Sequence, residues 1–151
     1  MIWKGNAFWE NLVFINRFAL SVEFTSKLSN DTWLLTRIYA PCTTIGKKGI
    51  FGVVREIDMP LEIDWLIVGD FNLIRRPDDR NRDGADPNEM FLFNEAINNL
   101  GLIELPLHGR QFTWTNKQFP PLRKIGLVLH LNLLDFQVPK YFSQNFGHGN
   151  I

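Results

Sequence analysis

The chain has 151 residues, of which 45% are hydrophobic and 21% are charged, so we expect one globular domain with a sizeable core rather than a disordered chain. Lysine plus arginine and aspartate plus glutamate number 16 each. The net charge therefore gives no argument for a nucleic-acid or membrane partner, and such a partner would have to meet a local patch.

The cell compartment is suggested by what the sequence does not contain. A single cysteine, Cys42, excludes an internal disulfide framework and fits a reducing compartment, and we expect no disulfide-linked partner. No apolar run approaches the ~20 residues of a membrane span, and the first residues show no signal-peptide pattern. We therefore expect an intracellular protein with no membrane partner.

The first half of the chain predicts a hairpin, a helix and a buried strand. Residues 19–26 alternate apolar and polar side chains, and residues 32–41 are rich in β-formers, so both are expected to be strands joined by a turn. Residues 49–58 place their apolar side chains at helical spacing. Residues 64–70, DWLIVGD, form a short continuous apolar run, which is typical of a strand buried on both faces.

The clearest helix is predicted over residues 87–100. Asp86 is a suitable N-cap, Pro87 suits the first helical position, and Glu89 stands where a capping box has its glutamate. Gly101 is expected to end the helix. One apolar stripe should face a sheet, formed by Met90, Phe93, Ile97 and Leu100.

The last third of the chain is less regular. Residues 102–106 and 110–116 are predicted strands, whereas residues 125–136 fit either a strand or a short helix. Residues 143–151 are expected to be a frayed tail. The order of elements predicts a mixed α/β layered domain, in which sites gather where buried strands end.

Asp70 and Asn72 follow the buried strand, in the sequence Gly-Asp-Phe-Asn. A carboxylate can act as a general base or metal ligand, and an amide can hold a phosphate oxygen or a water molecule. The alternative is that both are ordinary turn residues. The following loop has the same two interpretations: its arginines could meet phosphates, or its opposite charges could cancel in a solvated loop (Arg75, Arg76, Arg80 and Arg82).

Several stretches in this order resemble the endonuclease/exonuclease/phosphatase superfamily, and more narrowly the endonuclease domain of plant LINE-type (non-LTR) retrotransposons. They are WLLTRIYAPCT, DWLIVGDFN, the charged loop, and NEMFLFNEAINNLGLIELPLHGRQFTWTNKQ. The resemblance runs from about residue 3 to about residue 123. It implies a β-sandwich of two sheets flanked by helices. It also implies magnesium-dependent hydrolysis of phosphodiesters in DNA, and such a substrate suggests a nuclear location.

The resemblance also assigns roles to individual residues. Asp70 would orient or deprotonate the attacking water, Asn72 would position that water or the scissile phosphate, and Tyr39 would contact the phosphate. The candidate substrate-binding residues are Arg75, Arg76, Trp114 and Asn116. Magnesium would supply Lewis-acid stabilisation of the transition state.

The chain also departs from the family pattern. The family's first-strand asparagine and metal-binding glutamate lie upstream of the part that residues 2–14 resemble, and Gly126 stands where an aspartate is expected. The family's Ser-Asp-His motif does not occur, and residues 124–151 match poorly. We therefore expect a single partial domain over residues 1–151, incomplete at both ends and of marginal stability.

These departures predict a remnant of a DNA endonuclease domain that is inactive as written. Two alternatives stay open. One is an active phosphoesterase of the same superfamily, such as a phosphatase. The other is a non-catalytic module that binds nucleic acid or another partner.

Overall fold

The structure, a computed structural model, describes residues 6–57, 63–105, 112, 114–115, 119–124 and 127–131. Its elements, in chain order, are β1 Phe8–Ile15, β2 Ala19–Ser26, β3 Thr32–Tyr39, α1 Thr44–Glu56, β4 Asp64–Asp70, the 3-10 turn η1 Pro77–Asp79, α2 Pro87–Asn99, β5 Ile103–Glu104, β6 Trp114–Thr115, β7 Arg123–Lys124 and β8 Leu127–Leu131.

Six of these strands form one mixed sheet in the order β1-β2-β3-β4-β8-β5. The β2–β3 pair is an antiparallel hairpin, which confirms the pairing predicted from the sequence. β3 and β4 run parallel, and β8 pairs antiparallel with both β4 and β5. The two short strands β6 and β7 form a separate ribbon. The mixed α/β class is confirmed, whereas the sandwich of two full sheets stays a prediction.

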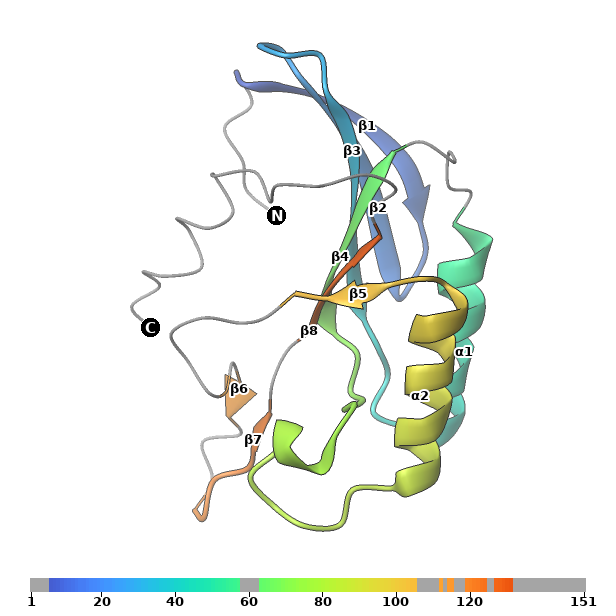
Figure 1. Cartoon of the computed structure of the whole chain (residues 1–151), viewed down its shortest axis with the longest axis vertical. Coiled ribbons are helices and arrows are strands. Elements are labelled where there is room, and N and C mark those ends of the chain that lie inside the picture. The colour runs from blue at the N-terminus through green and yellow to red at the C-terminus, as the bar shows by residue number, and fades with distance from the viewer. Residues whose placement is uncertain are drawn as a thin grey trace.

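Both helices lie side by side on one face of the six-stranded sheet (Figure 1). Trp65 and Ile67 of β4 point into the core between this face and the helices, and they are fully buried. Leu66 points to the opposite face, where it joins a second buried cluster that includes Phe24 and Leu35. The strand is therefore buried on both faces over residues 65–67, as predicted, and the interior position of β4 explains why no polar side chain interrupts that stretch.

A buried polar chain connects three strands beneath the helices. The Trp65 indole Nε1 donates to Thr36 Oγ1 over 2.8 Å, and the hydroxyls of Ser21 and Thr36 lie 2.8 Å apart. Ser21 and Thr36 have no exposed surface. An unpaired buried donor destabilises a fold by about 1–3 kcal/mol. These hydrogen bonds allow the Trp65 indole to be buried without that loss of stability.

The helix α2 matches its prediction closely. It spans Pro87–Asn99, and the Asp86 carboxylate accepts hydrogen bonds from the backbone N–H groups of Asn88 and Glu89. Phe93 and Ile97 are buried in the core as expected. The Glu89 carboxylate, which the sequence suggested for a capping box, instead accepts a hydrogen bond from Lys47 Nζ of α1 over 2.7 Å.

Two elements differ from the prediction, β1 and α1, and a third, β8, decides between two alternatives that the sequence left open. β1 was not predicted, because this edge strand exposes apolar side chains on both faces and so lacks a clear alternation. α1 begins at Thr44 rather than Gly49, because Thr43 Oγ1 caps it by accepting from Gly46 N. The segment that fitted either a strand or a helix contains the strand β8.

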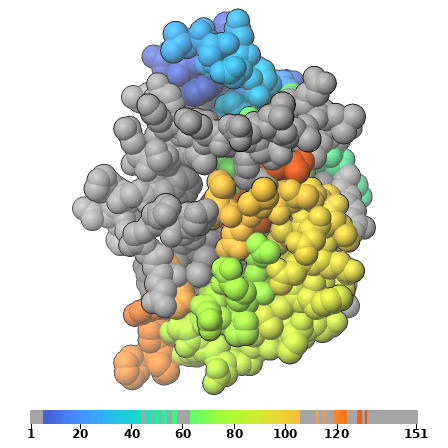
Figure 2. Space-filling view, viewed as in Figure 1, coloured from blue at the N-terminus to red at the C-terminus, as the bar shows by residue number. Residues whose placement is uncertain are grey.

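Parts of the predicted C-terminal region lie outside the described residues, including the expected tail and most of residues 106–118. The β7 segment is tied to the loop after β4, since Asn81 Oδ1 accepts from Arg123 N and Asn81 Nδ2 donates to the Pro121 carbonyl. In the space-filling view this loop and α2 form one continuous surface (Figure 2). No helix in the described ranges is long and apolar enough to cross a membrane.

Candidate active site at the carboxyl ends of β3 and β4

The Gly-Asp-Phe-Asn sequence makes the turn that ends β4. Gly69 has φ +147°, and a Cβ on it would overlap the carbonyl oxygen of Ile38 in β3, so a glycine is needed for this close approach. Phe71 is buried against Phe93, with ring centroids 5.4 Å apart, and anchors the turn to α2. Asn72 takes φ +51°, a left-handed conformation that asparagine tolerates better than most residues.

Hydrogen bonds hold Asp70 and Asn72 in a fixed arrangement. Asp70 Oδ1 accepts from Asn72 N over 2.9 Å, which is an Asx-type turn. Asn72 Nδ2 donates to the Ala40 carbonyl over 2.7 Å, and Ala40 N donates to the Asp70 carbonyl over 2.8 Å. The last two bonds join the ends of β3 and β4. Asp70 and Asn72 are therefore turn residues whose side chains are also fixed at the edge of the sheet.

Tyr39 lies beside Asp70. The two are register partners in the parallel β3–β4 pair, so their side chains project from the same face of the sheet. Tyr39 is 63% exposed, and Asp70 is half-buried. The structure therefore confirms that Tyr39, Asp70 and Asn72 converge at one edge.

Arg75 is the first arginine after Asn72, and its side chain is bonded to other residues of the protein. Arg75 Nε donates to Asn94 Oδ1, and its Nη1 lies 2.8 Å from Glu104 Oε2. The Arg75 side chain is only 21% exposed. Two of its guanidinium nitrogens are thus engaged between α2 and β5, and the substrate contact of Arg75 stays a prediction.

Arg76 is more accessible but also paired. Its Nε lies 3.3 Å from Asp79 Oδ1 and its Nη2 lies 3.5 Å from Glu104 Oε1, while its side chain remains 62% exposed. Asp79, which sequence reasoning did not single out, is buried and also accepts from the backbone N–H groups of Arg75 and Arg76. The loop charges thus cancel in specific pairs, and part of the loop is buried rather than solvated.

The last two predicted substrate-binding residues cannot be placed at the site. Trp114 belongs to β6, but its side chain lies outside the described part of the structure, as does Asn116.

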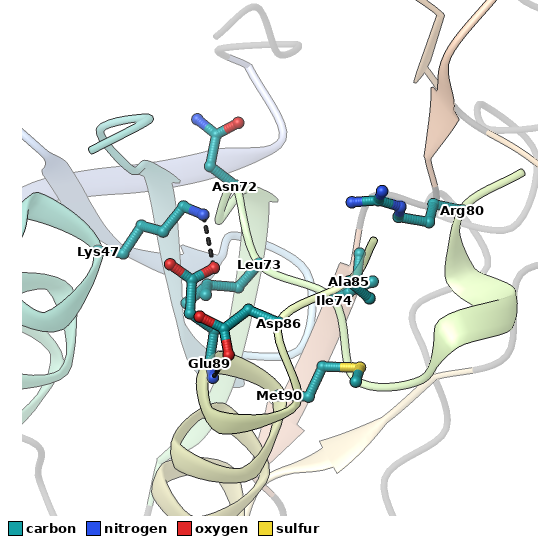
Figure 3. A pocket seen from close by; sticks show the side chains of 9 residues that line it. All are labelled: Lys47, Asn72, Leu73, Ile74, Arg80, Ala85, Asp86, Glu89 and Met90. Atoms are coloured by element: carbon teal, nitrogen blue, oxygen red, sulfur yellow. Dashed lines mark hydrogen bonds and ion pairs between the residues drawn. The ribbon is translucent and has the colours of Figure 1, made fainter. Parts of the chain in front are cut away.

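A small pocket of about 70 Å³ opens beside Asn72. Lys47 of α1 and Glu89 of α2 form an ion pair on one side of it, and Arg80 comes from the opposite side (Figure 3). The Arg80 guanidinium donates to the carbonyls of Arg82 and Asp83 in its own loop. The cations around this pocket are therefore occupied, and its volume suits ordered water more than a nucleotide.

No family model matches the sequence, and no curated protein matches it. Solved structures do match. The endonuclease domain of TRAS1, a telomere-specific non-LTR retrotransposon, aligns with a TM-score of 0.64 at 10% identity, covering 83% of this chain and 54% of that domain. The human Nocturnin catalytic domain aligns with a TM-score of 0.49 at 15% identity, covering 83% of this chain and 49% of that one.

The chain shares the fold of the TRAS1 endonuclease domain over most of its length. It spans about half the length of the solved structures that it matches. The fold resemblance inferred from the sequence is thereby confirmed, while its plant and LINE detail stays a prediction.

The resemblance drawn from the sequence implies a magnesium ion at this edge of the sheet. Magnesium is usually held by one or two carboxylates together with substrate phosphates. Asp70 contributes one carboxylate, and its Oδ1 already accepts from Asn72 N. Over the described ranges no three His, Cys, Asp or Glu side chains gather as a metal site. These residues alone do not complete a magnesium site, so the expected ion remains a prediction.

Proposed function

We propose that this chain is part of a magnesium-dependent DNA endonuclease domain from a plant LINE-type retrotransposon, and that its 151 residues do not hydrolyse phosphodiesters at a useful rate. The observation that carries the first half is the convergence of Tyr39, Asp70 and Asn72 at the ends of two parallel strands. The fold shared with the TRAS1 endonuclease domain supports it. A DNA substrate would place the protein in the nucleus.

The three residues would have separate roles in phosphodiester hydrolysis. Asp70, held by the Asn72 backbone, would accept a proton from the attacking water. Asn72 has its amide nitrogen bonded to the Ala40 carbonyl, which would leave its side-chain oxygen to orient that water. The exposed Tyr39 hydroxyl would donate to a phosphate oxygen.

The expected inactivity follows from the groups that phosphodiester hydrolysis needs and that this sequence does not provide. Hydrolysis develops negative charge on the phosphate, and losing one preorganised partner for such charge lowers the rate by ~10²–10³. Gly126 stands where the resemblance expects an aspartate, and no Ser-Asp-His occurs in the 151 residues. Several partners are therefore missing together, and the loss need not be additive because such groups act as a unit.

The test is the nicking of a supercoiled plasmid by the purified chain with magnesium, compared with its Asp70→Ala variant. We expect both proteins to leave the plasmid as intact as buffer does. Nicking that requires both magnesium and Asp70 would show that the chain is an active nuclease and would overturn the inactivity.

Two further assays separate the alternatives. Asp70-dependent hydrolysis of p-nitrophenyl phosphate would support a phosphatase instead of a nuclease. Binding of labelled DNA that weakens steeply with salt is expected both for the endonuclease remnant and for a nucleic-acid-binding module, because phosphate contacts release counterions, so this assay separates them from a module that binds another partner. If the folded chain binds no DNA at low salt, the DNA endonuclease origin loses its support.

A further inference from the structure

The sheet opens to solvent at the end of β3. Leu35 is buried in the cluster on the face opposite the helices, whereas Arg37 and Tyr39, two and four residues further on, are exposed. Alternate residues of a strand project from the same face. Arg37 therefore stands on the face that carries Tyr39 and Asp70. It lies two residues before Tyr39 along β3.

The register places Arg37 close to the candidate site. Arg37 is the partner of Val68, and Tyr39 is the partner of Asp70 on the same strand pair. Two residues of a strand span roughly 6.6 Å, since each residue rises about 3.3 Å. A long, flexible arginine side chain at this distance can reach a group that is bound beside Tyr39.

Arg37 differs from three other cations near the site. Lys47, Arg75 and Arg76 each form an ion pair with a carboxylate. Within the described part of the chain, the Arg37 guanidinium has no hydrogen bond, ion pair or ring contact, although it is exposed on a strand of the site. An unpaired guanidinium offers its five donors to an outside anion, and their planar arrangement suits phosphate.

We propose that Arg37 binds a backbone phosphate of the nucleic-acid strand, next to the phosphate that Tyr39 contacts. This assignment rests on the proposed function, and it adds an electrostatic contact with the strand at the exposed end of β3, outside the arginine loop after Asn72. Asp70 and Tyr39 address the phosphate at the site, and Arg37 fixes the register of the strand across it.

The experiment measures binding rather than hydrolysis, so it works on an inactive chain. A fluorescently labelled DNA duplex is titrated with the full chain at several salt concentrations. The logarithm of the association constant falls linearly with the logarithm of the salt concentration, and we expect Arg37→Gln to make this slope less steep by about 0.9. This corresponds to roughly five- to tenfold weaker binding at 0.1 M salt. Arg37→Lys should restore the slope, because lysine keeps the charge.

Two comparison variants test the position of the contact. Lys27→Gln also removes one exposed positive charge, but Lys27 follows β2 at the opposite end of the sheet, so binding should stay unchanged. Arg76→Gln should have a smaller effect than Arg37→Gln, because Arg76 is paired with Asp79 and Glu104. Thermal unfolding of Arg37→Gln should match that of the wild type, because no internal contact is lost.

The outcomes separate this inference from the proposed function. If the wild type binds DNA with a steep salt slope and Arg37→Gln binds equally well, the role of Arg37 is wrong while the proposed function stands. An Arg76→Gln effect larger than that of Arg37→Gln would also overturn it. If the folded wild type binds no DNA at all, both proposals fail.

Discussion

Gly69 is the residue on which the geometry beside Asp70 depends. Its φ of +147° and its contact with the Ile38 carbonyl leave no room for a Cβ. The helical Gly49 is the opposite case, because nothing lies within 4 Å of the position that its Cβ would take. The two glycines therefore form a matched pair for the same substitution.

We expect Gly69→Ala to destabilise the fold by more than about 2 kcal/mol, because β4 must move away from β3 or adopt a strained backbone. Gly49→Ala should instead stabilise it by about 0.5–1 kcal/mol, because alanine is the better helix former. Urea denaturation of both variants measures this difference. Equal stability of the two variants would mean that β3 and β4 do not approach as described.

Arg75 is expected to act on stability rather than on DNA binding. Arg75→Gln removes the ion pair to Glu104 and the bond to Asn94, and we expect a loss of about 1–3 kcal/mol. Arg82→Gln is the control for stability, because Arg82 is exposed and its side chain makes no contact within the described chain. Urea denaturation tests this, and an unchanged free energy of unfolding for Arg75→Gln would contradict it.

Among the elements, α2 provides the sharpest test of the core. Phe93 is 1% exposed and packs on Phe71, whereas Phe91 on the same helix is 63% exposed. Phe93→Ala should therefore lower the free energy of unfolding by about 3–5 kcal/mol. Phe91→Ala should change it by no more than about 0.5 kcal/mol. A loss below about 1 kcal/mol for Phe93→Ala would show that the predicted apolar stripe is not core.

The helices also explain why the site edge is rigid. Phe71 connects the Gly-Asp-Phe-Asn turn to α2, and the Lys47–Glu89 ion pair joins α1 to the start of α2. The Lys47 and Glu89 side chains are each 18% exposed, so solvent screens this ion pair less than it screens a surface pair. The turn that carries Asn72 is thus held by α2 through Phe71 and by the Ala40 carbonyl at the end of β3.

For the molecule as a whole, β1 is the strand that we expect to pair with other copies of the chain. It is an edge strand of the six-stranded sheet, and Trp9, Leu12 and Ile15 are each more than half exposed. Apolar edge strands pair readily with other chains.

We expect the wild-type chain to self-associate as its concentration rises, and Leu12→Lys to reduce this association, because a charged side chain on an edge strand opposes pairing. Leu28→Lys is the control, because Leu28 is 95% exposed but lies in the turn after β2. Sedimentation velocity over a range of concentrations measures the effect. An equal reduction by both variants would show that β1 is not the contact.

The sequence by itself determined the features that depend on neighbouring residues. The Asp86 cap and the apolar spacing placed α2, and the uninterrupted apolar run placed β4 inside the sheet. The turn between residues 26 and 32 indicated the β2–β3 hairpin. The Gly-Asp-Phe-Asn turn indicated where the site would lie, because its residue types are required by the local backbone.

Only the tertiary structure decided which partner each side chain has. Arg75, Arg76 and Arg37 look alike in the sequence, yet two are paired with carboxylates far along the chain and one is exposed beside Tyr39. Likewise, β1 lacks a clear periodicity and is a strand because β2 pairs with it. The physical reason is that hydrogen bonds and ion pairs between distant segments depend on the packing of the whole sheet, which no local pattern records.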